Sequence, residues 1–274
     1  MTITVCLASH KGGVGKTTSA VNLAVSAAAS NKKVLLVDID PQANATYSLA
    51  AKPAEGEYTI CDLLTRRPVE TSEVIHRQVR ENLDVIPSKL QLATVERELF
   101  SIAFGENKLM KALSKVADDY DLIVIDTPPN LGQLTINGLF SSNMVIIPVA
   151  PSAYALEGLS DIIDVINDLN QVNTNTSIKW KILKTMVDAR NRSTNEIVGE
   201  LLNPYGQRIF KTEVPRSEAA NQAPFEGKSI SDFDNKSPAA EAYVNLSDEI
   251  FASGSSSLSV NSVKSLKTNK PAKV

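Results

Sequence analysis

The sequence predicts an α/β fold with a doubly wound, mostly parallel sheet flanked by helices. Apolar runs rich in β-branched residues recur along the 274 residues, and they are continuous rather than alternating, as in strands buried on both faces of a parallel sheet. Stretches with helical spacing of apolar residues lie between these runs. A glycine-rich segment joins the first run to the first such stretch, so strands and helices alternate from the start of the chain.

The expected strands occupy the apolar runs in chain order. They cover residues 3–8, 34–37, 83–86, 122–125, 144–147, 178–187 and 208–214. Helices are expected at residues 17–30, 108–117, 158–169 and 239–251. The first helix is rich in alanine, and the third repeats leucine and isoleucine three or four residues apart, which gives an apolar face. In such a fold, ligands bind beyond the carboxyl ends of the parallel strands.

Length and composition favour one large domain followed by a short tail. Hydrophobic residues make up 43% of the chain, enough to fill the core of an α/β domain spanning residues 1–251. From residue 252 the sequence is rich in serine, asparagine and lysine and has no acidic residue, although the whole chain has a net charge of −3. Because this segment has little apolar surface to bury, we expect residues 252–274 to form a disordered Ser/Lys-rich tail.

The sequence contains no targeting or metal-cluster signal. It has no run of about 20 apolar residues, which a membrane-spanning helix requires, and its start lacks the charged-then-apolar layout of a signal peptide. We therefore expect a cytoplasmic protein. The two cysteines, Cys6 and Cys61, form no C-x-x-C pair, which excludes a disulfide framework and a local zinc or iron–sulfur site.

The glycine-rich segment has the composition of a phosphate-binding loop. It reads Lys11-Gly12-Gly13-Val14-Gly15-Lys16-Thr17-Thr18. Glycines let the backbone turn tightly and direct successive N–H groups at phosphate oxygens, and the start of the following helix adds partial positive charge. Lys16 can reach the terminal phosphates of a nucleotide, and the Thr17 hydroxyl can bind Mg²⁺. The segment therefore predicts a site for a nucleoside triphosphate with Mg²⁺.

Two further strands end in aspartates. The run 122–125 is followed by Asp126, and the run 34–37 is followed by Asp38 and then Asp40. A phosphate-binding loop needs a carboxylate at the end of a neighbouring strand, because Mg²⁺ takes oxygen ligands in near-octahedral geometry and keeps several waters. We expect Asp126 to be that carboxylate.

These motifs resemble one family. The general pattern G-x-x-x-x-G-K-[ST] requires glycine at position 10, where this chain has His10, whereas Lys11 and the paired glycines match the deviant Walker A form K-G-G-x-G-K-[ST] of the ParA and MinD ATPases. The stretches Asp38-Ile39-Asp40-Pro41-Gln42-Ala43-Asn44-Ala45-Thr46 and Asp126-Thr127-Pro128-Pro129 are similar to the D-x-D-P-Q-x-N-x-T and D-x-P-P segments of the ParA branch. The resemblance extends over residues 1–251.

The resemblance implies an ATPase that uses ATP and Mg²⁺, and it gives roles to individual residues. In the family, the lysine matching Lys11 reaches across a dimer interface to the nucleotide of the other protomer. Asp40 would orient the attacking water or assist its deprotonation, and would contact Mg²⁺ through water. Asp38 would be structural or would support the site without touching the nucleotide. Pro215 would flank the adenine. Phosphoryl transfer depends mainly on positioning and charge stabilisation, so a weak base such as Asp40 suffices.

The ParA branch also implies partners. ATP would drive formation of a homodimer, the dimer would bind DNA without sequence preference, and a ParB-like or cargo-adaptor protein would stimulate slow hydrolysis. We expect a cytoplasmic, nucleoid-associated protein that partitions or positions a plasmid, a chromosome or another large cargo. On the family pattern, Arg190 and Arg216 are the candidates for contact with DNA phosphates.

Three alternatives make different demands on the sequence. A MinD-like membrane-associated ATPase would need a C-terminal amphipathic helix, but residues 258–267 lack aromatic anchors and are rich in poor helix formers, so we expect no membrane association. A metabolic enzyme that passes phosphate to a small acceptor would need a substrate pocket rather than Lys11 in a dimer interface. Family members that repress transcription have a helix-turn-helix domain ahead of the first strand, and without one we expect no operator binding.

Overall fold

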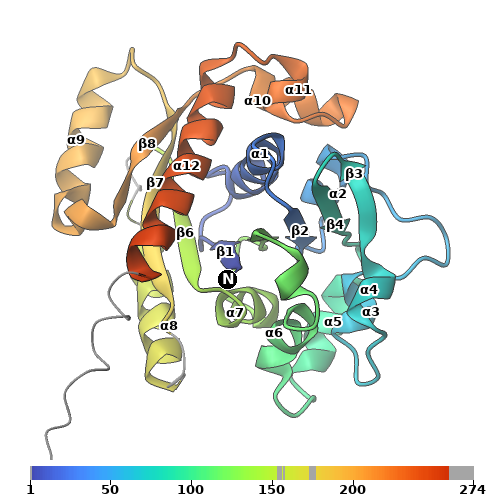
Figure 1. Ribbon diagram of the computed structural model, residues 1–274. Helices are drawn as coiled ribbons and strands as arrows, with labels where there is room; N and C mark the ends of the chain where they lie inside the picture. The colour runs from blue at the N-terminus through green and yellow to red at the C-terminus, as the bar shows by residue number, and fades with distance from the viewer. Residues whose placement is uncertain (1, 153–155, 157, 173–176, 259–274) are drawn as a thin grey trace, which may run out of the picture.

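One eight-stranded sheet runs through the computed structural model, which describes residues 2–152, 156, 158–172 and 177–258, without the side chains of 172 and 254–258. The strand order is β3-β4-β2-β5-β1-β6-β7-β8 (Figure 1). The strands are β1 (Ile3–Leu7), β2 (Val34–Asp38), β3 (His76–Arg80), β4 (Leu83–Ile86), β5 (Leu122–Asp126), β6 (Met144–Val149), β7 (Lys179–Val187) and β8 (Ile209–Pro215).

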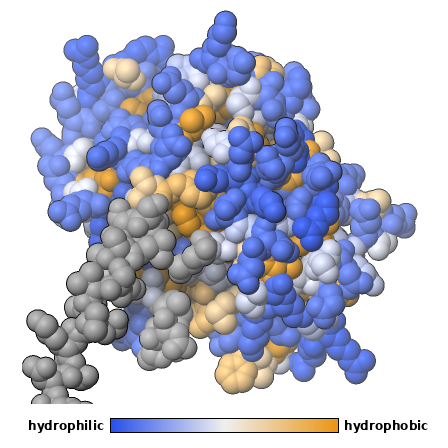
Figure 2. Space-filling model, in the orientation of Figure 1, coloured by the Kyte–Doolittle hydropathy of each residue, from blue (hydrophilic) through white to orange (hydrophobic). Residues whose placement is uncertain are grey.

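Helices cover both faces of the sheet (Figure 1). One face packs against α1 (Lys16–Ala29), α2 (Asn44–Ser48), α10 (Ala219–Gln222), α11 (Ile230–Phe233) and α12 (Pro238–Leu258). The other packs against α3 (Ile60–Leu63), α4 (Thr71–Val74), α5 (Leu92–Leu99), α6 (Lys108–Leu113), α7 (Gln133–Phe140), α8 (Leu159–Val172) and α9 (Arg192–Leu202). The surface drawn in Figure 2 is mostly hydrophilic, with apolar side chains in separate spots.

Burial on both faces explains the continuous apolar runs. Every residue of β2, β5 and β6 is buried, and in β5 the side chains of Leu122 and Val124 join the core under α1 and α12 while Ile123 and Ile125 join the core on the opposite face. Neighbouring strands from β4 to β8 are parallel. The predicted doubly wound α/β class is therefore confirmed.

The edge strand β3 was not predicted. It pairs with β4 in the antiparallel direction. Its sequence, HRQVR, is mostly polar, in keeping with the fact that none of its residues is fully buried. Asn82, with φ of 60°, forms the turn between the two strands. An edge strand of this kind gives no continuous apolar signal.

Two of the predicted helices end at other residues than expected. The helix expected over residues 108–117 ends at Leu113, and a separate 3₁₀ turn follows at Ala117–Asp119. The last helix runs to Leu258, so residues 252–258, expected to be disordered, are helical. Extending an existing helix costs less than starting one, and the Ser253 hydroxyl donates to the Glu249 carbonyl at 2.8 Å. The rest of the expected tail, residues 259–274, lies outside the described residues.

Helix α12 contacts both α1 and the edge strand β8 through polar side chains. Its Tyr243 is fully buried against α1, where the phenol oxygen lies 3.1 Å from Ser19 Oγ. Further along, the Glu249 carboxylate accepts hydrogen bonds from the backbone N–H groups of Lys211 and Thr212 on the edge strand β8, and from Lys181 Nζ at 3.1 Å. Among the described helices, none is both long and apolar enough to cross a membrane.

Candidate functional site

The glycine-rich loop connects β1 to α1 at the carboxyl end of the parallel strands. Gly13 and Gly15 have φ of 72° and 83°, a left-handed conformation that residues with a Cβ rarely adopt. The Val14 carbonyl accepts a hydrogen bond from Thr185 Oγ1 on β7 at 2.8 Å, and the Lys11 N–H donates to Ser9 Oγ at 3.2 Å. These contacts hold the loop in a curved conformation of the kind that binds anions.

The two lysines of the loop point to different places. Lys16, at the start of α1, is only 7% exposed, and its Nζ donates to the Lys11 carbonyl at 3.1 Å, inside the curve of the loop. Burial lowers the pKa of Lys16, and the charges of Asp126 and Asp40 oppose that shift. Lys11 Nζ donates to Ser152 Oγ at 3.1 Å, beyond the end of β6. Lys16 is thus placed for phosphate of its own loop, and Lys11 lies at the rim.

Asp126 ends β5 directly beside Asp38 at the end of β2. It is fully buried, and neither carboxylate oxygen has a hydrogen-bond partner among the described residues. Burial, then the charge of Asp38, raises the pKa of Asp126 well above its ordinary value, although the Thr17 hydroxyl and Lys16 lower it. A buried carboxylate with open lone pairs next to a threonine hydroxyl is suited to a cation.

Mg²⁺ fits this donor set. It binds through one or two protein oxygens and completes its shell with waters and substrate phosphates. Among the described residues, no group of three or more His, Cys, Asp or Glu side chains could hold a metal ion. Gly12 packs near Pro129, where a Cβ on the glycine would lie 3.9 Å from the proline Cβ, so the segment after Asp126 borders the loop.

Asp38 and Asp40 belong to one hydrogen-bonded turn after β2. Asp38 accepts from the Asp40 N–H at 3.0 Å and from both the N–H and the hydroxyl of Thr46, at 2.9 and 2.8 Å. Ser88, after β4, donates its N–H to Thr46 Oγ1 and its hydroxyl to the Asp40 carbonyl. Burial raises the pKa of Asp38 to about 6. Asp38 therefore has a structural role in this turn, and Asp40, 6% exposed, accepts from the Gln42 N–H.

Thr46 and Ser88 are functional-site residues to which sequence reasoning gave no role. Both hydroxyls are fully engaged within the turn that carries Asp40. The available signals were Thr46 at the last position of the D-x-D-P-Q-x-N-x-T stretch and Ser88 two residues after the strand 83–86. The signal at Ser88 is weak, because serine is common in the turns that follow strands in any fold.

A pocket of about 300 Å³ opens beside the loop and brings Pro215 together with Gly15 and Thr18. Its wall also includes Met186 and Asp188 at the end of β7. Met186 has φ of 54° within the strand, and its methyl group would lie 3.6 Å from a Cβ placed on Gly15. Sequence reasoning did not single out Met186, since nothing in a β-strand pattern marks a left-handed methionine. The pocket adjoins the phosphate loop, where a nucleotide base is expected.

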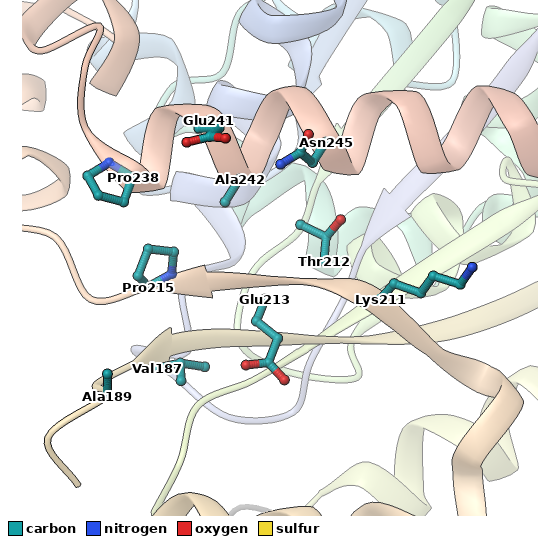
Figure 3. Close-up of a pocket in the computed structure, with 10 residues that line it drawn as sticks. All are labelled: Val187, Ala189, Lys211, Thr212, Glu213, Pro215, Pro238, Glu241, Ala242 and Asn245. Carbon is teal, nitrogen blue, oxygen red and sulfur yellow. The ribbon is translucent and has the colours of Figure 1, made fainter. Parts of the chain in front are cut away.

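A larger hollow of about 530 Å³ lies between β8 and α12 (Figure 3). Figure 3 shows Lys211, Thr212, Glu213 and Pro215 along β8 opposite Pro238, Glu241, Ala242 and Asn245 of α12. Pro215 lines both cavities, but no residue of the glycine-rich loop lines this one. Its lining also includes two carboxylates, which disfavours a phosphate ligand.

Arg190 and Arg216 lie at the same corner of the molecule, beyond the ends of β7 and β8. The Arg190 guanidinium donates from Nε and Nη2 to the two carboxylate oxygens of Asp188, at 3.0 and 2.8 Å, and its side chain is 87% exposed. The Arg216 N–H donates to the Val187 carbonyl at 3.0 Å, and Arg216 contributes to lowering the pKa of Asp188. Both arginines therefore have exposed positions near the mouth of the smaller pocket.

Known proteins are similar to this chain in sequence and in fold. A family model described as an AAA domain matches residues 2–180. The sporulation initiation inhibitor protein Soj of Bacillus subtilis is 41% identical over 251 residues, which cover 91% of this chain and 98% of that protein. The chromosome partitioning protein ParA of Myxococcus xanthus is 39% identical, with 90% and 87% covered.

A solved structure agrees with these relatives. The crystal structure of cobyrinic acid a,c-diamide synthase from Mycobacterium smegmatis with bound ATP analog and magnesium has a TM-score of 0.81 and 29% identity, with 94% of this chain and 97% of that chain covered. This chain has the glycine-rich loop, the buried aspartates and a mostly parallel sheet. Its similarity to these proteins covers about 90% of its length. The protein therefore belongs to the ParA-type family of P-loop ATPases.

Proposed function

We propose that this protein is an ATP-dependent switch ATPase that partitions or positions a plasmid, a chromosome or another large cargo. ATP binding drives formation of a homodimer, the dimer binds DNA without sequence preference, and a ParB-like or cargo-adaptor protein stimulates slow hydrolysis. The names of the relatives Soj and ParA support the partition role. The observation that carries the ATPase part is Asp126, a buried carboxylate with two open oxygens beside Lys16 and Thr17.

Different residues of the chain have different roles at the nucleotide. Lys16 and the N–H groups of the loop hold phosphate charge, and Lys11 at the rim serves the nucleotide of the other protomer. Thr17 and Asp126 would hold Mg²⁺, with Asp40 contacting it through water, and the bound ion would supply positive charge to the phosphate oxygens. Asp40 orients the attacking water because the turn built by Asp38 fixes its backbone. Pro215 flanks the adenine in the pocket beside Gly15.

The domain assignment forms part of the proposal. Residues 1–251 make the ATPase domain, and the segment from 252 is a Ser/Lys-rich extension whose first residues continue α12. Arg190 and Arg216 contact DNA phosphates, and their exposure at one corner supports this role. The protein acts in the cytoplasm, associated with the nucleoid.

Parallel binding assays test the proposal against the MinD-like alternative. The purified chain is mixed with non-specific duplex DNA and with anionic liposomes, each with ATP or ADP at two salt concentrations. DNA binding that requires ATP and weakens steeply with salt is the expected result, because lysine and arginine contacts with phosphates release counterions. Binding to liposomes without binding to DNA would reject the DNA-partition role and support the membrane-associated one.

A further inference from the structure

The corner that contains Arg190 has a carboxylate that the ATPase chemistry does not use. Asp188 follows β7 and accepts three hydrogen bonds from Arg190: from the backbone N–H at 3.0 Å, from Nε at 3.0 Å and from Nη2 at 2.8 Å. The Asp188 side chain is 15% exposed, whereas that of Arg190 is 87% exposed. An exposed arginine is therefore tied to a largely covered acid.

The geometry of this pair leaves one edge of the arginine available. A guanidinium is planar and has two edges that can each bind an oxyanion with two parallel hydrogen bonds. Asp188 occupies the edge formed by Nε and Nη2. The edge formed by Nη1 and Nη2 is not the one that contacts Asp188, and the side chain as a whole is 87% exposed.

The backbone of Asp188 is also fixed. Its carbonyl accepts from the Asn191 N–H and from Asn195 Nδ2, both at 2.9 Å, at the start of α9. Asp188 also lines the pocket beside Gly15 and Thr18. Asp188 thus borders the proposed base site, accepts hydrogen bonds from the first turn of α9 and its N-cap, and pairs with Arg190.

We propose that Asp188 is a positioning residue that presents the outer edge of Arg190 to a DNA phosphate. This rests on the proposed function, in which Arg190 contacts DNA. A long side chain held in its binding orientation loses less conformational entropy on contact, so the pair raises affinity for DNA even though the acid adds a negative charge beside it. Asp188 also lines the pocket proposed for the nucleotide base. The residue that orients the DNA contact would therefore lie next to the bound nucleotide.

The sign of one substitution separates positioning from simple charge. Asp188→Asn removes a negative charge and one of the two acceptors for the guanidinium. If charge alone mattered, this variant would bind DNA more tightly. Positioning predicts the opposite, a dissociation constant about threefold to tenfold higher, as expected when one rotamer-rich side chain must be ordered on binding.

The experiment is fluorescence anisotropy with a labelled non-specific duplex and a non-hydrolysable ATP analogue, on the full chain. The matched control is Glu196→Gln, which removes an exposed carboxylate from α9, the same corner, and should leave affinity unchanged or tighten it by up to about twofold. The double variant Asp188→Asn with Arg190→Ala should bind like Arg190→Ala alone, because Asp188 acts only through the arginine.

A second variant covers the case in which Asp188→Asn fails to fold. Arg190→Lys keeps the charge at an exposed position but loses the planar fork, and we expect DNA binding weaker by about threefold with unchanged affinity for the nucleotide. Equal or tighter DNA binding by Asp188→Asn, or weakening that persists in the Arg190→Ala background, would overturn the role of Asp188. Failure of the unmodified chain to bind DNA would instead reject the proposed function.

Discussion

The aspartates at the ends of β2 and β5 and the aspartate at the end of β7 occupy the same edge of the sheet in opposite settings. Burial raises the pKa of Asp38 to about 6 and that of Asp126 well above its ordinary value. Hydrogen bonds from Arg190 lower the pKa of Asp188 to about 2. The buried pair is therefore stabilised when a cation arrives, whereas the outer aspartate already has one. If the proposed function is right, the cation site and the DNA contact lie at separate places along this one edge of the sheet.

The largest effect expected in the buried region follows removal of the buried lysine Lys16. Lys16→Ala should abolish ATP binding, with at least a hundredfold loss of affinity, about 3 kcal/mol, because the buried ammonium is lost where phosphate charge would lie. Titration calorimetry with Mg²⁺ and ATP measures it. Lys33→Ala, at an exposed lysine before β2, is the control and should bind normally. Affinity within tenfold of the unmodified chain would contradict the assignment of Lys16.

Asp40→Ala should separate binding from turnover. The variant retains the phosphate loop and Asp126, so it should bind ATP, but its hydrolysis rate should fall by about a hundredfold or more because water is no longer oriented. The ATP-bound dimer should then accumulate, as measured by size-exclusion chromatography alongside phosphate release. Asp118→Ala, at an exposed aspartate, should behave as the unmodified chain does. Unchanged turnover would remove Asp40 from the mechanism.

Asp38→Ala should act on stability rather than on chemistry alone. It removes the acceptor for three hydrogen bonds and leaves the Thr46 and Asp40 N–H groups without it, so the free energy of unfolding should fall by about 2 kcal/mol. Denaturant titration measures this change. Glu196→Gln at the exposed corner should change stability by less than about 0.5 kcal/mol. If Asp38→Ala and Glu196→Gln lowered the free energy of unfolding equally, the hydrogen bonds of Asp38 would not stabilise the fold more than an exposed carboxylate does.

The smallest effect is a pH dependence. Because the folded-state pKa of Asp38 is raised to about 6 from an ordinary value of about 3.9, its protonated form favours the folded chain, and that contribution is lost as the pH rises between these values. Relative to Asp38→Asn, the unmodified chain should lose a few degrees of Tm, on the order of 3–6 °C, from pH 4 to pH 7. Calorimetric scans of both chains measure it.

The outer aspartate provides the contrast for this test. The lowered pKa of Asp188 makes its stabilising contribution present above about pH 4 and lost as the pH falls toward 2, so it adds no slope between pH 4 and pH 7. A Tm difference between the unmodified chain and Asp38→Asn that stays constant across this window would argue against a raised pKa at Asp38.

The sequence was informative where residues are buried and constrained from several sides. Strands buried on both faces gave continuous apolar runs, and the glycine-rich loop requires particular residues at fixed spacing, so both were predictable. The edge strand β3 is polar and partly exposed, and its pairing with β4 depends on a turn at Asn82 rather than on hydrophobicity. The extension of α12 to Leu258 continues a helix that is already formed, and a composition rich in serine and glycine gives no signal for it.

The same division applies to the site. Lys16, Thr17 and Asp126 could be placed together because a phosphate loop and a strand-end carboxylate have a fixed relation in the fold. The pairing of Asp188 with Arg190, the left-handed backbone of Met186 and the links through Thr46 and Ser88 arise from local three-dimensional geometry. No periodic pattern in the chain reports such contacts.

The carboxylate of Glu249 affects how the protein behaves at high concentration. Strand β8 ends the sheet, and an open edge of this kind can recruit a strand from another chain and start aggregation. Glu249 engages the N–H groups of Lys211 and Thr212, and Pro215 at the end of the strand has no N–H to offer. The outer edge of the sheet therefore offers fewer open N–H groups to a strand of another chain, which disfavours edge-to-edge aggregation.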